Sequence, residues 1–300
     1  MSQPQQRRNN ATTNNKSPTT NPKKKHQSSQ AAYQFNVVLQ SLLQTSQKRP
    51  PSWEKVQEAQ NLLLIRVQQK TDTGSNTAAL MDYDTVSFNI VMQAWARQHS
   101  MEAAQAADDL LRTLWHETNL QADSYSYAAV LHAYAKAGGE RQAALRATEL
   151  LQEFLQLAAT PPSTTLPGHS PPRTDVCHNA VMDAWAASGD ARAGQRAEQI
   201  LRKLQQDPRR TATRVSYNAV IKAYAKSGQP EDAQRILDEM KQVASQDAGK
   251  NGHVAPDKVS LSTCMHAWAK STQSFPLAAA RADALLCEME DTYARTGNEY

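Results

Sequence analysis

Apolar and polar residues alternate along this chain with the period of an α-helix, and the pattern repeats. One segment recurs five times without gaps, and a weaker copy, AYQFNVVLQSLLQ, begins at Ala32. The five copies are TVSFNIVMQAWARQ from Thr85, SYSYAAVLHAYAKAG from Ser124, DVCHNAVMDAWAASG from Asp175, RVSYNAVIKAYAKSG from Arg214 and KVSLSTCMHAWAKS from Lys258. Self-similarity at intervals of about 40 residues indicates a repeat array.

A second apolar stripe follows each copy, so every unit is predicted to contain two antiparallel helices. The stripe starts at an alanine and continues three, four and seven residues later, as in Ala197, Ile200, Leu201 and Leu204, which is one face of a helix. Glycines end several first helices, where a left-handed residue is favoured; they are Gly138, Gly189 and Gly228. The predicted fold is all-α, a right-handed superhelical α–α solenoid of about six helix-turn-helix repeats.

The chain divides into a repeat array and two tails. We place the array at residues 31–292, after a basic segment at 1–30 that is disordered or a targeting segment, and before a tail at 293–300. The units are 32–84, 85–123, 124–174, 175–213, 214–257 and 258–292. Residues 160–174 and 245–256 are rich in Pro, Gly and polar residues and are predicted to be loops.

Aromatic residues seven positions apart lie on one face of each first helix and are predicted to form the core. The pairs are Phe88 and Trp95, Tyr127 and Tyr134, His178 and Trp185, and Tyr217 and Tyr224. Three widely spaced cysteines, Cys177, Cys264 and Cys287, are expected to be small buried thiols. No apolar run reaches the roughly 18 residues of a membrane span, so we expect no membrane contact.

Another side of the first helix carries a second stripe, which we call the track. In the unit beginning at Arg214 its members are Val215, Asn218, Lys222 and Lys226, at spacings of three, four and four. The first member of the track is always apolar, the second is usually an amide and the last is usually a cation. The first members are Tyr33, Val86, Tyr125, Val176, Val215 and Val259. The second members are Asn36, Asn89, Ala128, Asn179, Asn218 and Ser262. The last members of the five good copies are Arg97, Lys136, Ala187, Lys226 and Lys270.

An apolar plate, an amide and a cation in this order fit a nucleotide, because they can meet a base face, a base edge and a phosphate. Two simpler interpretations stay open. The asparagines could be helix caps, although Ser87, Ser126, Ser216 and Ser260 already offer a hydroxyl nearby. The cations could be placed only by the helix dipole.

The composition offers little for catalysis. The third track position holds Gln93, His132, Asp183, Lys222 and His266, so its two histidines are expected to line a groove. No metal-ligand spacing, nucleophile motif or phosphate loop occurs. We therefore expect no enzyme, no catalytic residue, no cofactor and no metal site.

The segment VSYNAVIKAYAKSG, followed by EDAQRILDEMK, resembles the pentatricopeptide repeat (PPR) family. The resemblance extends from residue 32 to about 292 and implies binding of single-stranded RNA, one base per repeat. It assigns base reading to the second track member together with the last residue of the same unit. The implied pairs are Asn36 with Asp84, Asn89 with Asp123, Ala128 with Thr174, Asn179 with Thr213 and Asn218 with Asp257, and Ser262 stands without a partner.

Further roles follow from the same resemblance. It implies that Val86, Tyr125, Val176, Val215 and Val259 sandwich the bases, and that Arg97, Lys136, Lys226 and Lys270 contact phosphates. Asn with Asp resembles a uridine reader, so a U-rich or pyrimidine-rich RNA is expected. The expected function is sequence-selective RNA binding in organellar RNA processing, stability or translation.

Several alternatives remain beside this interpretation. A protein-binding solenoid similar to tetratricopeptide arrays stacks helix pairs in the same way, and protein partners at the C-terminal end are a further expectation.

Residues 1–53 contain eight Lys or Arg residues, and the first acidic residue of the chain is Glu54. That composition fits a transit peptide or a solvated tail equally. The expected location is the mitochondrion, with plastid or cytoplasm as alternatives.

Overall fold

The computed structural model of the chain describes residues 22–44, 49–72, 83–159, 174–206, 212–246 and 254–296. Within these ranges there are twelve helices and no strand. The first helices of the six units are α1 (Pro22–Leu43), α3 (Thr85–Ala96), α5 (Ser124–Lys136), α7 (Thr174–Ala187), α9 (Arg214–Lys226) and α11 (Lys258–Lys270). The second helices are α2 (Trp53–Asp72), α4 (Met101–His116), α6 (Arg141–Ala159), α8 (Ala193–Gln206), α10 (Pro230–Gln246) and α12 (Ala278–Thr296).

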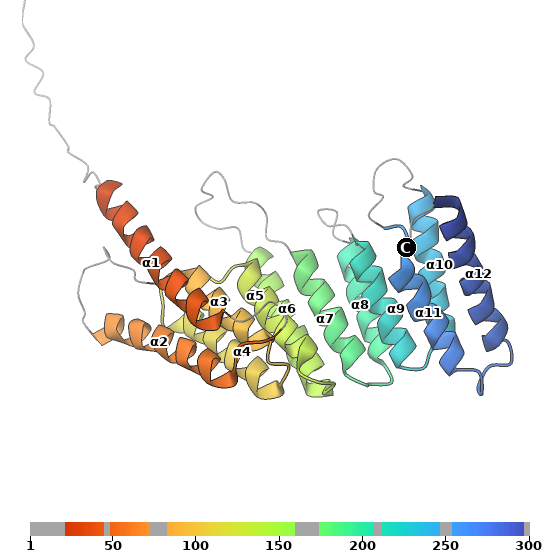
Figure 1. The fold of residues 1–300 in the computed structure, drawn as a ribbon, viewed down its shortest axis with the longest axis horizontal. Coiled ribbons are helices and arrows are strands. Elements are labelled where there is room, and N and C mark those ends of the chain that lie inside the picture. The colour runs from red at the N-terminus through yellow and green to blue at the C-terminus, as the bar shows by residue number, and fades with distance from the viewer. Residues whose placement is uncertain are drawn as a thin grey trace, which may run out of the picture.

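The helix pairs stand side by side in one extended row, from α1 and α2 at one end to α11 and α12 at the other (Figure 1). Each first helix packs against its own second helix and against the next first helix along the row. The first helices therefore form one continuous layer, and the predicted all-α solenoid of six helix pairs is confirmed. None of the described helices combines the length and apolarity that a bilayer crossing demands.

Three boundaries differ from the sequence prediction. Helix α12 continues to Thr296, so residues 293–296, predicted to lie in the C-terminal tail, are helical. Helix α1 begins at Pro22, so residues 22–30, predicted to lie in the tail, are helical. Proline is favoured in the first turn of a helix and no further Pro or Gly follows before Leu43, which accounts for the longer helix. Thr174, predicted to end a loop, is the first residue of α7. The other residues of that loop and most of 245–256 lie outside the described residues.

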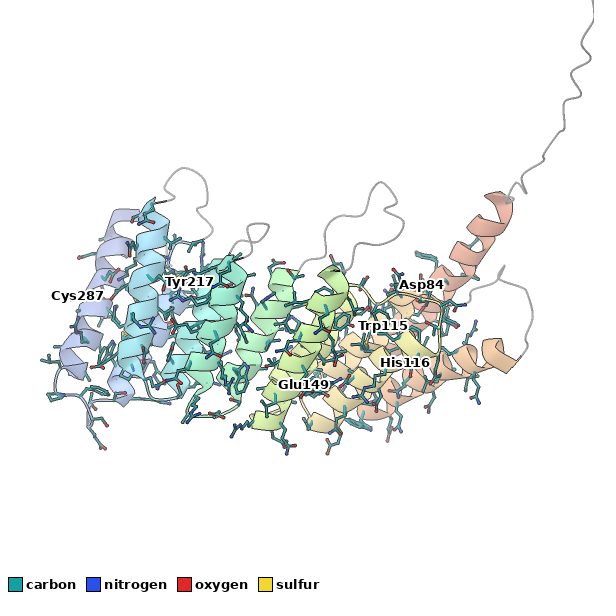
Figure 2. The ribbon with its side chains drawn as sticks, turned by 180° about the vertical axis from the view of Figure 1, so that it is seen from behind. Asp84, Trp115, His116, Glu149, Tyr217 and Cys287 are labelled. Atoms are coloured by element: carbon teal, nitrogen blue, oxygen red, sulfur yellow. The ribbon has the colours of Figure 1, made fainter. Side chains whose placement is uncertain are left out.

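The predicted aromatic core is confirmed. Phe88, Tyr127, Trp185 and Tyr217 each expose no more than 3% of their surface, and His178 exposes 2%. Cys177 and Cys264 are buried as expected, and burial raises the pKa of the Cys264 thiol to about 12. The expectation for Cys287 is wrong. It is exposed on α12 at the end of the row, where no further unit covers it among the described residues (Figure 2).

A hydrogen bond from an aromatic side chain joins each unit to the next. Its acceptor is the polar residue that follows the first alanine of the second-helix stripe. Tyrosine hydroxyls meet carboxylates and tryptophan indoles meet neutral oxygens. The pairs are Trp95 with Gln60 (2.6 Å), Tyr134 with Asp108 (3.0 Å), Trp185 with Thr148 (3.0 Å), Tyr224 with Glu198, and Trp268 with Gln234 (3.2 Å).

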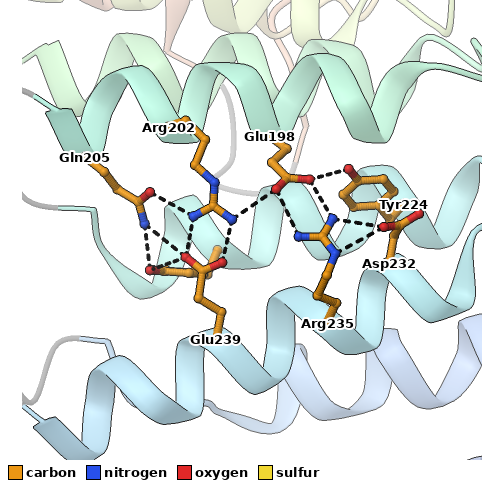
Figure 3. Close-up of polar contacts among 8 residues, drawn as sticks. Glu198, Arg202, Gln205, Tyr224, Asp232, Arg235 and Glu239 are labelled. Atoms are coloured by element: carbon orange, nitrogen blue, oxygen red, sulfur yellow. Dashed lines mark hydrogen bonds and ion pairs between the residues drawn. The ribbon is translucent and has the colours of Figure 1, made fainter.

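The two carboxylates in this series also bind arginines from the next second helix. Arg146 lies 2.8 Å from Asp108. Arg235 lies 2.8 Å from Glu198, and Figure 3 shows this second contact. Hydrogen bonds from Arg235, and then from Tyr224 and Arg202, lower the pKa of Glu198 to about 2 against the opposing effect of desolvation. These charged contacts tie second helices that otherwise touch little.

Candidate nucleic-acid interface

The apolar members of the track are exposed, although the first helices carry a buried face as well. Val86, Tyr125, Val215 and Val259 expose between 49% and 61% of their surface. Val176 is only half-buried and packs partly against the core. A single exposed apolar side chain is common on a protein surface, but one at the same position in most units forms a regular row, which favours a binding surface.

The predicted base-reading pairs contact one another directly. The amide Nδ2 of Asn36 donates to Oδ1 of Asp84 at 3.1 Å, and Asn218 donates to Asp257 at 3.2 Å. Asn89 contacts Asp123 in the same way at 3.2 Å. Residues 34 to 48 positions apart are therefore neighbours at these three junctions between units, because the last residue of one unit is the N-cap of the next first helix.

A serine completes each of these contacts. The hydroxyl groups of Ser87, Ser126 and Ser260 donate to the amide oxygens of Asn36, Asn89 and Asn218 at 2.6 to 2.7 Å. The carboxylate can only accept, so the amide nitrogen must face the aspartate and the amide oxygen must face the serine. The orientation of each asparagine is thereby settled by its neighbours.

The helix caps are the aspartates, so the interpretation of the asparagines as caps is wrong. Asp84, Asp123 and Asp257 are the N-cap residues of α3, α5 and α11, and each accepts from the backbone N–H of the serine three residues later. The serine hydroxyl accepts the N-cap backbone N–H in return, which completes a capping box. The serines are thus the third helical residue and not the cap.

Most of each asparagine is covered by these contacts. Asn36 and Asn89 expose 8% and 7% of their surface, and Asn218 is half-buried. The contacts within the triads use only Oδ1 of each aspartate and one N–H of each amide. What each triad offers to a ligand is therefore narrow: a second amide N–H as donor and Oδ2 as acceptor.

The third triad has an additional cation beside it. The Nη1 atom of Arg214 lies 3.7 Å from Oδ2 of Asp257. Desolvation raises the pKa of Asp257, but hydrogen bonds from Ser260 and Asn218 together with Arg214 outweigh it, and the pKa is lowered. The Arg214 Nε is buried without a hydrogen-bond partner among the described residues. The sequence contains no signal for this contact, since the two residues are 43 positions apart.

The remaining pairs do not form the same triad. Ala128 is buried and has no polar side-chain atom with which to meet Thr174, itself 2% exposed. Asn179 accepts from Ser216 Oγ at 2.8 Å, and that hydroxyl also lies 3.3 Å from Thr213 Oγ1. Among the residues that the structure describes, Ser262 donates a hydrogen bond only to the carbonyl of Val259 in its own helix, at 3.4 Å.

The cations predicted to contact phosphates all lie at the ends of first helices. Lys136, Lys226 and Lys270 are exposed in the last turns of α5, α9 and α11. Arg97 is exposed as the C-cap of α3, and it also donates to the carbonyl of Arg49 at 3.1 Å. This position suits the helix dipole and a phosphate equally well.

One ion pair crosses the track, and sequence reasoning did not pair its members. Lys222 on α9 lies with Nζ 2.9 Å from Oδ1 of Asp183 on α7. Asp183 also affects His132 of α5. Desolvation and the positive charge of Lys136 lower the pKa of His132, and the negative charge of Asp183 partly opposes this shift. The third track position thus brings an imidazole, a carboxylate and an ammonium group together across three neighbouring first helices.

Other polar clusters in the described part of the chain offer no obvious chemistry. A hollow of about 870 Å³ is lined by residues of α10, α11 and α12, including Gln234, Arg235 and Trp268. Arg235 and Trp268 are already engaged in the contacts between units. No group of three His, Cys, Asp or Glu side chains that could hold a metal occurs among the described residues.

Comparison with known proteins identifies the repeat. The family model described as PPR repeat matches residues 215–243, which comprise nearly all of α9 and most of α10. Residues 215–243 are thus identified as a PPR repeat. No curated protein matches the sequence of the chain.

The PPR match covers one of the three units whose asparagine belongs to a complete triad. Asn218 and Val215 lie inside the matched segment, and Asp257 closes the unit just beyond it. PPR repeats generally bind single-stranded RNA, and their proteins are generally RNA binders without catalysis. The track on the first-helix layer is therefore the candidate RNA interface of this chain.

Proposed function

We propose that this PPR protein binds single-stranded RNA along the track, with one base opposite each unit, and prefers uracil at the units closed by Asn and Asp. The observation that carries the proposal is the triad of Asn, Asp and Ser at three junctions. Each triad lies beside an exposed apolar side chain and one helix length from an exposed cation. A base face, a base edge and a phosphate are the three features of a nucleotide that such a unit can meet.

The hydrogen-bonding atoms left in the triad favour certain bases. The aspartate Oδ2 only accepts, so it suits a base whose ring nitrogen carries a proton, as uracil and guanine do, and disfavours adenine and cytosine. The amide N–H can meet the neighbouring carbonyl of the same base. The resemblance to uridine-reading repeats then favours uracil over guanine.

The activity proposed is occupancy of RNA without turnover. A bound stretch of about six nucleotides would change RNA folding or the access of other proteins, since units bind one base each. We propose the mitochondrion as the compartment on the acid-free, basic composition of residues 1–53 alone. A reporter fused to that segment should enter mitochondria, and a diffuse signal would contradict this part.

Binding to RNA of defined sequence tests the proposal. Fluorescent oligo-U, oligo-A and double-stranded RNA should be titrated into the wild type and into Asn89→Ala/Asn218→Ala. We expect oligo-U to bind most tightly and the double variant to lose that preference. Asn61→Ala, on the exposed surface of α2, is the matched control.

Two outcomes would overturn the proposal. One is equal or absent binding of all three nucleic acids to the wild type, which would favour a groove for peptides. The other is an unchanged preference in the double variant. Circular dichroism should confirm that the variant is folded, because each asparagine also joins two units.

A further inference from the structure

The α7 unit keeps the amide at the second position of the track, as Asn179, but differs from its neighbours at the other three positions. Val176 is half-buried, whereas the equivalent residues of α3, α5, α9 and α11 are exposed. Ala187 stands where the other good copies have Arg or Lys, and the unit closes with Thr213 in place of an aspartate. The third position holds Asp183, the only acidic residue at that position. The middle of the row thus presents the least favourable surface for RNA.

Asp183 also acts on the neighbouring unit. Its carboxylate lies 2.9 Å from the ammonium group of Lys222, and the two side chains expose 34% and 45% of their surface. Both groups are therefore accessible from the track side. A phosphate that approached this site would be repelled by the negative charge of Asp183. The ammonium group of Lys222 would already be paired with that carboxylate. Screening by water and salt reduces this repulsion but does not reverse its sign.

We propose that Asp183 divides the track into two RNA-holding segments, by withholding Lys222 from phosphate and by repelling the backbone at the α7 unit. This inference rests on the proposed RNA-binding function. The first segment comprises α1, α3 and α5, and the second comprises α9 and α11. The nucleotide opposite α7 connects the two segments, and its base and its phosphate make few stabilising contacts with the protein.

The substitution Asp183→Asn tests the inference, because it removes the charge and keeps the size. Lys222 is then free to neutralise one more phosphate. The single-strand rule predicts a salt slope steeper by about 0.7, which is about fivefold in affinity for each tenfold dilution of salt. The measurement is fluorescence anisotropy of an oligo-U of about eight nucleotides at several KCl concentrations. Asp232→Asn on α10 makes the same charge change away from the track.

A double-mutant cycle separates this mechanism from a general gain in positive charge. Lys222→Ala should change wild-type binding by less than about twofold, since Lys222 is withheld there. On the Asp183→Asn background the same change should remove most of the gain. Equal effects of Lys222→Ala on both backgrounds would overturn the proposal.

Uncharged linkages in the RNA give an independent measurement. One methylphosphonate should be placed at each linkage in turn. At one interior linkage the replacement should leave wild-type binding unchanged or tighter, yet weaken binding to Asp183→Asn. If the wild type binds oligo-U but Asp183→Asn binds it no more tightly, the inference about Asp183 is wrong and the proposed RNA-binding function still stands. If the wild type does not bind single-stranded RNA, the proposed function itself fails.

Discussion

Trp185 on α7 donates its indole N–H to the hydroxyl oxygen of Thr148 on α6 at 3.0 Å. The indole is almost fully buried, so this acceptor cannot be replaced by bulk water without a shift of the helices. Thr148→Val keeps the shape and removes the oxygen. We expect the free energy of unfolding to fall by about 1 to 3 kcal/mol, measured by urea denaturation. Thr148→Ser keeps the acceptor and should lose less; a larger loss for Ser than for Val would contradict this account.

Glu198 should make the stability depend on pH. Its pKa falls from the ordinary 4.5 to about 2 in the folded protein, so its contribution is full above about pH 4.5 and is lost as the pH falls toward 2. The shift corresponds to about 3 kcal/mol at most. Because the partner Arg235 is half exposed, we expect Glu198→Gln to cost about 1 to 2 kcal/mol at pH 7.

The measurement is urea denaturation followed by circular dichroism at pH 7, 4 and 3. The difference between the wild type and Glu198→Gln should narrow as the pH falls. Glu149→Gln is the control, since this more exposed glutamate pairs with Arg146, which keeps Asp108 as a partner. A difference that is constant from pH 7 to pH 3 would show that the charge is not responsible.

Gly194 allows α8 to approach α9 closely. A Cβ at this position would lie 2.1 Å from Cδ1 of Tyr224, whose hydroxyl is held by Glu198. Gly194→Ala should therefore cost about 1 to 3 kcal/mol in spite of the better helix propensity of alanine. Thermal denaturation checks the loss. On a Tyr224→Ala background the same change should cost nothing, and an undiminished cost there would refute the steric explanation.

The cation at the end of α9 should contribute to RNA affinity through charge alone. Lys226→Ala removes one phosphate neighbour, so the slope of log K against log salt should decrease in magnitude by about 0.7. Lys203→Ala makes the same change on the exposed surface of α8, outside the track. Equal slopes for both variants would mean that Lys226 does not touch the RNA.

Asp257→Asn should change which base is preferred. Asparagine also caps helices well, and the ion pair lost with Arg214 is partly exposed, so the free energy of unfolding should fall by no more than about 1 kcal/mol. Its amide N–H would replace the accepting Oδ2, and would then suit the lone pair of cytosine N3 and oppose the N3–H of uracil. Anisotropy with oligonucleotides that differ at one position should show a shift from U to C, whereas Asp232→Asn should leave the preference unchanged.

The repeating pattern of apolar residues was sufficient to predict the helix pairs, their order and most of the core. That information is local, since spacings of three, four and seven residues define a face of one helix wherever the helix lies. The same spacing separated the track from the buried face. The pattern did not predict that α1 begins at Pro22, because residues 22–30 are polar and contain no apolar stripe with a helical period.

Contacts between units were decided by the tertiary structure. The resemblance paired Asn218 with Asp257, but only the stacked first helices show that they share a hydrogen bond and that the aspartate caps α11. The match of Tyr with carboxylates and Trp with neutral acceptors, and the ion pair of Asp183 with Lys222, join residues 26 to 39 positions apart. A helical period relates residues within one helix, whereas these contacts depend on how far one helix is rotated and shifted against the next. That register comes from packing of the whole row.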